Sequence, residues 1–424
     1  MQQQPLYKIT HIHLDQLDTP LHTLYTRPGS YLVFWWDSIA LGHMFIEPGH
    51  QLTQEEYHDR LIEAIKPAVK VYIRKAHKLG GCWQHLLADG KTEEWLSLMA
   101  SFFTTSAADK IPARVPVSVV ICTRNRANHL HKCLSTLHQL RCLPEEIVVV
   151  DNAPSDDATK NVVALFRDVR YVRELRPGLS NARNTGIQTA SHPIIAFTDD
   201  DVTVHPDWVY RVWQTFEESN VAAMTGLVIV SELQTEAQLI FEKHWSFNRG
   251  YADVLYDAAY FSTTLPFGPP VWKIGAGANM AFRRTIFEEV GLFHQELGAG
   301  ASGCSEDSEM WFRILAHGHT IHYNPRAAVF HEHRKEFKEL KKQIYYYMRG
   351  FTAAALFQQH QHHKANYKKH LSKVLPKHYL RMIIRGFPRY RSRLSTVWVE
   401  VQGMLSGLVY YHRNRSRFSK PSPK

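Results

Sequence analysis

The sequence predicts an α/β fold whose central sheet is mostly parallel and is covered by helices on both faces. Short apolar runs rich in β-branched residues recur at 117–122, 147–150 and 194–197. Stretches of helical length and pattern separate them, at about 127–140 and 156–166. Strands that are buried on both faces read as continuous apolar runs, and helices placed between them favour parallel order.

Residues 1–110 are expected to form a small α+β domain of unassigned role. The run 31–36 is predicted to be a buried strand. Thr53 and Glu56 have the spacing of a capping box, which predicts that a helix begins there. The segment 106–112 is rich in small and turn-forming residues and is interpreted as a linker to the α/β domain.

Length and composition indicate a folded protein of two or three units. The chain has 424 residues, more than one ordinary core, and 44% of them are hydrophobic, which excludes a disordered chain. The formal net charge of +10 favours an anionic partner, such as nucleotide phosphates or an acidic membrane surface. Binding to nucleic acid is not expected, because aromatic and basic residues do not interleave in the basic tail.

The sequence predicts a cytoplasmic location. The five cysteines lack the paired spacing of a metal site and are expected to be reduced thiols. The first residues lack the charged-then-apolar pattern of a signal peptide. No run reaches the roughly 18 apolar residues that span a bilayer.

Residues 334–424 are predicted to be a basic helical extension. Between 378 and 393, apolar residues such as Leu380 and Ile384 are mixed with arginines. Helices of this kind bind anionic membrane faces, which predicts peripheral attachment to the inner face of the plasma membrane. A helical cap packed on the catalytic domain is the alternative.

An acidic run directly follows the strand predicted at 194–197. Asp199, Asp200 and Asp201 repel one another unless a cation offsets their charge. Hard divalent cations prefer oxygen ligands and leave positions open for phosphates. Ligands of parallel sheets bind at the carboxyl ends of strands, so the run predicts a Mg²⁺ or Mn²⁺ site. A solvated turn with helix-capping carboxylates is the alternative.

Two earlier strand ends also carry polar residues. Asp151 ends the strand at 147–150 and could accept a hydrogen bond from a nucleobase or a ribose, although Asp-Asn-x-Pro also suits a plain turn. Thr123 closes the first strand, and the basic segment 124–126 opens the next helix, where a diphosphate would bind well. An ordinary strand-to-helix turn is the alternative.

Further candidates lie downstream. Arg183, near the flexible Gly178, could reach a phosphate or a base. The small-residue segment 275–279 would let a substrate approach the backbone. Glu306-Asp307 begins a helix and is either favoured there by the helix dipole or contains a general base.

The final candidate follows the apolar strand 327–330. His331 and His333 lie on one face of that strand, and one imidazole could complete the ligand set of the cation.

The order of these motifs resembles the family-2 glycosyltransferases over about residues 115–333. The similarity rests on seven elements in order: 117–126, 146–152, Gly178 with 181–184, 197–201, 277–279, 306–307 and 329–331. It implies a GT-A type, Rossmann-like fold. It also implies an inverting, metal-dependent hexosyltransferase of class EC 2.4, which uses a nucleotide-sugar donor and Mn²⁺ or Mg²⁺. The acceptor would be a hydroxyl of a glycan or a lipid-linked saccharide, in the synthesis of cell-surface polysaccharide or glycoconjugates.

The resemblance also implies residue roles. The donor would be bound by Thr123, Asp151, Arg183 and Asp199, and the metal by Asp201 and His331. Asp307 would be the catalytic base, and the acceptor would be bound by Gly277, Asn279 and Glu306. Asp200 would be only the spacer of a D-x-D motif.

Some features depart from the family pattern. Cys122-Thr123-Arg124 replaces a frequent proline and aromatic residue, and Asn152 replaces a frequent aspartate, which leaves the donor base open. The absence of a Gln-x-x-Arg-Trp motif argues against a processive synthase. Two alternatives stay open: a non-catalytic carbohydrate- or membrane-binding protein on the same scaffold, and another nucleotide-using transferase.

Overall fold

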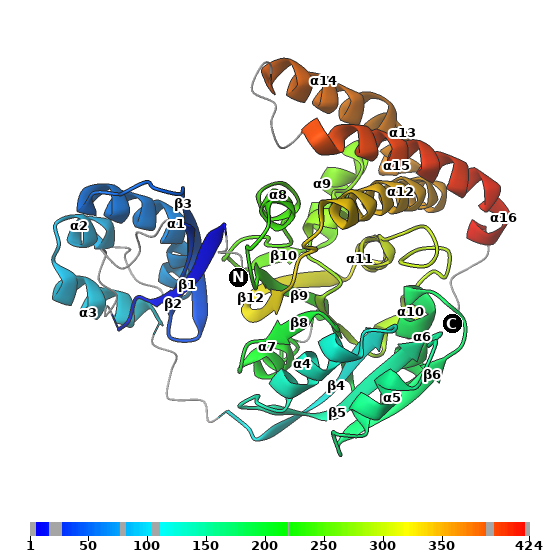
Figure 1. Cartoon of the computed structure of the whole chain (residues 1–424), viewed down its shortest axis with the longest axis horizontal. Coiled ribbons are helices and arrows are strands. Elements are labelled where there is room, and N and C mark those ends of the chain that lie inside the picture. The colour runs from blue at the N-terminus through cyan, green and yellow to red at the C-terminus, as the bar shows by residue number, and fades with distance from the viewer. Residues whose placement is uncertain are drawn as a thin grey trace.

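Two sheets organise the protein (Figure 1). The computed structural model describes residues 6–16, 28–76, 82–103, 111–218, 220–386 and 394–419. Within these residues, one sheet has three strands in the order β1-β2-β3, and the other has nine, with the path β10-β12-β9-β11-β7-β4-β5-β6 and β8 paired to β12.

The N-terminal unit is built on the small sheet. Its elements are β1 (Tyr7–His13), β2 (Gly29–Trp36), β3 (Ile39–Ile46), α1 (Gln54–Lys75), α2 (Trp83–Ala88) and α3 (Thr92–Phe103). The predicted strand at 31–36 lies within β2. The predicted capping box is confirmed: the Thr53 hydroxyl accepts from the Glu56 N–H, and the Glu56 carboxylate accepts from the Thr53 N–H at 2.8 Å. Residues 106–110 of the predicted linker lie outside the described residues.

Four parallel strands form the first half of the large sheet, in the order β7-β4-β5-β6. They are β4 (Arg114–Thr123), β5 (Leu143–Asn152), β6 (Val169–Glu174) and β7 (Ile194–Asp199), connected through α4 (Ala127–Leu137), α5 (Ala158–Val163) and α6 (Leu179–Thr189). The predicted alternation of apolar strands and helices is therefore confirmed.

Side-chain alternation along these strands divides the core into two layers. Val119 and Ile121 of β4 pack with α4 and α7 on one face. Val120 and its neighbour Phe197 pack with α6 and α11 on the other. Both faces are covered because successive side chains of a strand point to opposite sides, and here both sets are apolar.

The second half of the sheet is mixed. It contains β8 (Val202–Val204), α7 (Trp208–Thr215), β9 (Val221–Val230), α8 (Glu236–Trp245), β10 (Val254–Tyr256), α9 (Ala258–Thr264), β11 (Asn279–Arg283), α10 (Ile286–Val290), α11 (Glu306–Ala316) and β12 (Thr320–His331). Strand β11 runs antiparallel between β7 and β9, whereas β12 is parallel to β9. The parallel order ends after β7 because the chain no longer repeats the strand–helix–strand unit that imposes it.

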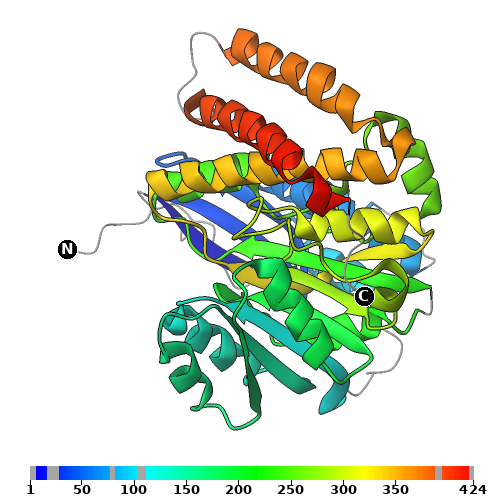
Figure 2. The ribbon, with the colours of Figure 1, turned by 90° about the vertical axis from the view of Figure 1, so that its right-hand side faces the viewer.

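Helices cover the upper side of the molecule in Figures 1 and 2. They are α12 (Phe337–Gln361), α13 (Tyr367–Lys369), α14 (Leu375–Gly386), α15 (Leu394–Arg413) and α16 (Arg415–Phe418). Helix α15 packs closely on α12, where a Cβ on Gly403 would lie 2.4 Å from the carbonyl oxygen of Tyr345. Helix α14 lies farthest from the sheet (Figure 2). Part of the predicted basic helical extension, including the arginines at 389, 391 and 393, lies outside the described residues. Within the described part of the chain, no helix has the length and apolar character to cross a membrane.

The N-terminal unit packs against β9 and β12 of the large sheet. Its core includes Leu227 and Ile229 of β9 and Ala328 of β12. Trp35 stacks on His205 at a centroid distance of 5.4 Å, and His11 contacts Phe330 edge-on. The unit therefore supports the strand that ends at His331.

Candidate active site

A cavity of about 1220 Å³ opens where several strands of the large sheet end. Thr123, Asn152, Asp199 and His331 are the last residues of β4, β5, β7 and β12, and all four line it. The candidate site thus lies at the carboxyl edge of the parallel strands, where α/β sheets bind ligands.

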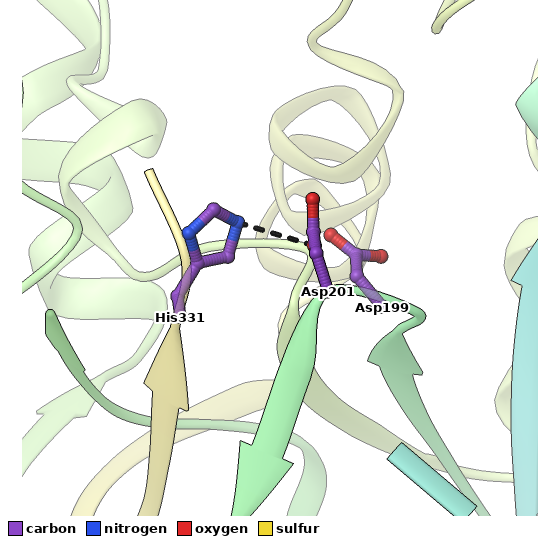
Figure 3. Close-up of side chains that lie close together, drawn as sticks. All are labelled: Asp199, Asp201 and His331. Atoms are coloured by element: carbon purple, nitrogen blue, oxygen red, sulfur yellow. Dashed lines mark ion pairs between the residues drawn. The ribbon is translucent and has the colours of Figure 1, made fainter. Parts of the chain in front are cut away.

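Asp199, Asp201 and His331 form a cluster that could hold a metal ion (Figure 3). One ligand atom from each lies within 4.8 Å of the others. Nε2 of His331 is 3.4 Å from Oδ1 of Asp201. Burial lowers the pKa of His331 to about 4. Burial opposes ionisation of Asp201, but His331, Arg126 and Arg334 outweigh it and lower its pKa to about 2.

This protonation pattern fits a divalent cation. At neutral pH an ionised Asp201 carboxylate therefore faces a neutral His331 imidazole. Oxygen ligands with one imidazole suit Mn²⁺ well, and carboxylates alone suit Mg²⁺. The donor set of these three residues is therefore compatible with the expected metal.

The acidic run is electrostatically strained without a cation. Burial, reinforced by Asp201 and Asp200, raises the pKa of Asp199 to about 7. Burial and the Asp201 charge raise the pKa of Asp200 to about 6. Carboxylates that resist ionisation because of like charges are stabilised by a cation, so metal binding would relieve this strain.

Asp200 is more than a spacer. Its Oδ2 accepts a 2.7 Å hydrogen bond from the Thr123 hydroxyl, and Arg126 bridges its carboxylate to that of Asp201. Asp200 therefore ties the end of β4 to the acidic run. The Thr123 side chain, predicted to contact the donor, lines the cavity but uses its hydroxyl proton in this contact.

Arg183 is a buried link between several parts of the site. Its side chain is 3% exposed and forms an ion pair with Glu306 of α11. Its Nη2 also lies 3.5 Å from the carbonyl oxygen of Gly277 and 3.9 Å from Oδ1 of Asp199. Burial and the Arg183 charge act in opposite directions on Glu306, and burial prevails, raising its pKa to about 7. Both side chains line the cavity, but much of their bonding capacity is used between them.

Asp307 is held in one orientation and lines the cavity. Its Oδ2 accepts a 2.9 Å hydrogen bond from the Gly277 N–H, and its Oδ1 accepts one of 2.6 Å from the Ser308 N–H. A Cβ on Gly277 would lie 3.1 Å from Oδ2 of Asp307 and 2.7 Å from Nη2 of Arg183. Glycine is therefore needed here to let Asp307 approach the backbone.

Asn279, expected to bind the acceptor, lies elsewhere. It is fully buried, and its amide nitrogen donates to the carbonyl oxygens of Leu227 and Ala327 while its oxygen accepts from Trp208 Nε1. The expectation is corrected: Asn279 joins β9, β12 and α7, and it has no surface left for a substrate. The motif position alone could not reveal this.

Asp151 does not line the cavity itself, but it precedes Asn152, which does. It is fully buried, and its Oδ2 accepts a 2.8 Å hydrogen bond from the Tyr171 hydroxyl. Its Oδ1 has no well-formed hydrogen bond, and burial raises its pKa. An acceptor atom of this kind near the edge of the sheet is compatible with the expected nucleoside contact.

Left-handed backbone conformations mark the loops of the site. Asn125 after β4, Ala153 after β5 and Ser305 before α11 have φ values of 55°, 46° and 71°. Such conformations are costly for residues other than glycine and cluster at functional sites. The Asn125 side chain also accepts a hydrogen bond from the Ser155 N–H, which joins the first two loops.

Several lining residues were not predicted individually. Arg334 approaches Asp201 at 3.8 Å, and Trp272, Arg349 and Tyr379 also line the cavity. Arg349 belongs to α12 and Tyr379 to α14. No local motif marks these positions, because only tertiary packing brings the C-terminal helices over the site.

Comparisons with known proteins find similarity to glycosyltransferases. The family model described as Glycosyl transferase family 2 matches residues 118–291. A pre-mycofactocin glycosyltransferase of Mycobacterium tuberculosis is 25% identical over 252 residues, which are 59% of this chain and 49% of that protein. A glucosyl-dolichyl phosphate glucuronosyltransferase of Haloferax volcanii is 25% identical over 237 residues, 52% of this chain and 71% of that protein.

Among solved structures, a mannosyltransferase from Pyrobaculum calidifontis in complex with GDP-Man and Mn²⁺ overlaps 84% of this chain and 99% of its own. Its TM-score is 0.46 at 17% identity, a weak similarity. The chain spans about half the length of the mycobacterial relative. The motif order and the α/β sheet agree with the family match, so residues 118–291 form a domain similar to the family-2 glycosyltransferases.

Proposed function

We propose that this protein is an inverting, metal-dependent glycosyltransferase that moves a sugar from a nucleoside-diphosphate sugar to a hydroxyl acceptor. The observation that carries the proposal is the joint position of the Asp199–Asp201–His331 cluster and Asp307 on one cavity. The first would bind the cation of the donor diphosphate, and the second would act on the acceptor. Thr123, Asp151 and Arg183 are proposed to hold the donor side of the site.

The proposed reaction is a single displacement. Asp307 accepts the proton of the acceptor hydroxyl while that oxygen forms a bond to C1 of the sugar. The bond between C1 and the diphosphate oxygen breaks on the opposite side, and its electron pair leaves with the nucleoside diphosphate. A bound cation would neutralise the charge that grows on this leaving group. The Gly277 and Ser308 N–H groups keep Asp307 aimed at the cavity.

Donor turnover provides the test. The purified protein would be incubated with a panel of nucleotide sugars, with Mn²⁺ or EDTA, and release of nucleoside diphosphate would be measured. We expect cation-dependent release for one donor, lost in Asp201→Ala. Release that is equally fast in EDTA, or full turnover by Asp201→Ala, would contradict the metal assignment.

We further propose that the acceptor is a saccharide attached to a lipid through phosphate. Helix α12 brings the cations Lys342 and Arg349 and the ring of Phe351 to the cavity, where Trp272 packs against Phe351. Cations suit a phosphate group, and aromatic faces suit sugar rings and apolar chains. The name of the haloarchaeal relative also contains a lipid-linked sugar phosphate.

The outer surface of α14 supports attachment to an anionic membrane. Leu380 and Ile384 are 57% and 65% exposed and lie one turn apart, next to the exposed cations Lys377 and Arg381. Exposed apolar side chains among basic ones bind anionic bilayers. Tyr379 of the same helix lines the cavity, so attachment there would bring a lipid-linked acceptor to the site.

Two paired comparisons test these assignments. Lys342→Glu is expected to raise KM for a lipid-phosphate acceptor at least about tenfold, whereas Lys338→Glu, on the same helix but outside the cavity, is not. A KM raised as much by Lys338→Glu as by Lys342→Glu would contradict the acceptor assignment.

The double variant Leu380→Asp/Ile384→Asp is expected to stop co-flotation with vesicles that contain anionic lipid. The control Leu165→Asp/Leu175→Asp alters equally exposed leucines elsewhere. Equal loss of co-flotation in the two double variants would contradict the membrane assignment.

A further inference from the structure

A chain of buried polar side chains leads away from the proposed metal site. Nδ1 of His331 lies 3.2 Å from Nδ1 of His333. Nε2 of His333 lies 3.0 Å from Oε2 of Glu242, a residue of α8. The three side chains are each less than a tenth exposed. Glu242 is about ninety residues from His333 in the sequence, so only the fold brings them together.

The order of groups in this chain determines which nitrogens carry protons. A carboxylate only accepts, so Nε2 of His333 donates to Glu242, and its Nδ1 is then a bare acceptor in the neutral ring. With one proton on each ring, Nδ1 of His331 donates to His333, which leaves Nε2 of His331 unprotonated. That atom is the one that lies 3.4 Å from Oδ1 of Asp201.

Aromatic rings shield the two imidazoles from water. Phe241 contacts the His333 ring at a centroid distance of 4.5 Å, and Phe247 contacts the His331 ring edge-on at 5.2 Å. Apolar rings on both imidazoles limit the access of water, which would otherwise offer competing donors and acceptors. Ser246 donates to the second oxygen of Glu242 at 3.0 Å and so restrains the carboxylate.

We propose that Glu242 and His333 are positioning residues that hold His331 in the Nδ1–H tautomer, so that its Nε2 lone pair points at the cation held by Asp199 and Asp201. This inference rests on the proposed metal-dependent function. Metal-binding histidines commonly pass their second N–H to a carboxylate or carbonyl, which fixes the ring and its tautomer. Here the link to the carboxylate runs through a second histidine.

Residues of the N-terminal unit lie close to Glu242, at the far end of this chain of groups. Glu242 lines a small cavity of about 370 Å³ together with His43 of β3, Ala64 of α1 and Tyr251. His43 Nδ1 lies 2.9 Å from the Tyr251 hydroxyl, and burial together with the Glu242 charge raises the pKa of Tyr251. The N-terminal unit therefore contributes His43 and Ala64 to the surroundings of Glu242 at the far end of the chain of groups.

Binding of Mn²⁺ to the full-length protein tests the role of Glu242. Free Mn²⁺ would be measured by electron paramagnetic resonance during titration. We expect Glu242→Leu to weaken Mn²⁺ binding about 10- to 100-fold. Glu242→Gln keeps an oxygen that can accept from His333 and is expected to restore affinity to within a few-fold of the original protein. Thr215→Val removes other buried hydrogen bonds, those to Asn324 and the Arg211 carbonyl, and is expected to leave Mn²⁺ affinity unchanged.

The tautomers give a second, independent readout. Long-range ¹⁵N spectra of the unaltered protein, assigned by loss of signals in His331→Gln and His333→Gln, should show His331 as the Nδ1–H form and His333 as the Nε2–H form. An Nε2–H form of His331 would overturn the inference, as would normal Mn²⁺ affinity in a folded Glu242→Leu protein. Failure of the unaltered protein to bind Mn²⁺ would instead overturn the proposed metal-dependent function and this inference together.

Discussion

The Arg183 guanidinium and the Glu306 carboxylate form an ion pair at the centre of the site, with side chains only 3% and 6% exposed. Arg183 comes from α6 and Glu306 from the start of α11, next to Asp307. The pair thus links the helix that carries the proposed base to the helix that follows β6. Because Arg183 also approaches Gly277 and Asp199, it connects the proposed acceptor side of the site to the proposed donor side.

Removing the acidic partner should destabilise the protein strongly. Glu306→Leu leaves the Arg183 charge buried without its main partner, which typically costs about 3–5 kcal/mol. The free energy of unfolding from denaturant titration would measure this loss. Glu289→Gln, which breaks the exposed contact with His319, should cost less than about 1 kcal/mol. Similar costs for the two variants would be inconsistent with a structural role of the buried pair.

Substitution of the proposed base should act mainly on the chemical step. Asp307→Asn keeps the shape of the side chain but cannot take a proton, so we expect kcat for transfer to fall about 10²- to 10⁴-fold. The affinity for nucleoside diphosphate should stay the same. Steady-state kinetics and equilibrium binding would separate the two. Ser308→Ala removes only a 3.2 Å hydroxyl contact to Asp307, and its kcat should change by no more than a few-fold.

The acidic run should make the metal-free protein less stable as pH rises. The folded-state pKa of Asp199 is about 7, against an ordinary value of 3.8. The folded state therefore binds more protons than the unfolded state between about pH 4 and 7, and stability falls across that window. Solvent screening reduces the effect, because the side chain is 36% exposed.

Asp199→Asn removes this titration. In EDTA at pH 8 the variant should melt at a higher temperature than the original protein, and Mn²⁺ should no longer raise its melting temperature. Calorimetry at pH 5 and pH 8, with and without Mn²⁺, would measure both effects. A variant that melts lower than the original protein in EDTA at pH 8 would show that Asp199 is not strained.

Acid should loosen the docking of the C-terminal helices. His294 stacks on Phe418 of α16 at 5.1 Å, and its Nδ1 accepts from the Glu296 N–H. Burial, assisted by Arg313, lowers its pKa from 6.5 to about 4. The unfolded state thus binds the extra proton, so stability is complete above about pH 6.5 and is lost as pH falls toward 4, by roughly 3 kcal/mol.

His294→Gln should flatten this part of the pH profile. The free energy of unfolding, followed between pH 4 and pH 7, would provide the comparison. His317→Gln is a suitable control, because that imidazole lies at the end of α11 and contacts the Arg313 carbonyl of the same helix. A profile for His294→Gln as steep as that of the unaltered protein would assign the acid loss to other groups.

The sequence by itself determined the layered sheet and the position of most motifs. Apolar runs alternate with helical stretches, and this periodicity is local, so β4, β5 and β7 were predictable from neighbouring residues alone. The rule that ligands bind at the carboxyl ends of parallel strands then placed Asp199, Asp201 and Thr123 at one edge. The capping box at Thr53 and Glu56 was predictable for the same reason, since it involves residues three apart.

Only the tertiary structure decided which of these side chains face the cavity and which hold the site together. Asn279 was expected at the acceptor, but it is buried between β9, β12 and α7, and Asp200 braces the end of β4. The chain from His331 through His333 to Glu242 and the wall formed by α12 and α14 join residues far apart in the sequence. Such contacts arise from packing, which no local pattern encodes, because burial and hydrogen-bond partners depend on the whole fold.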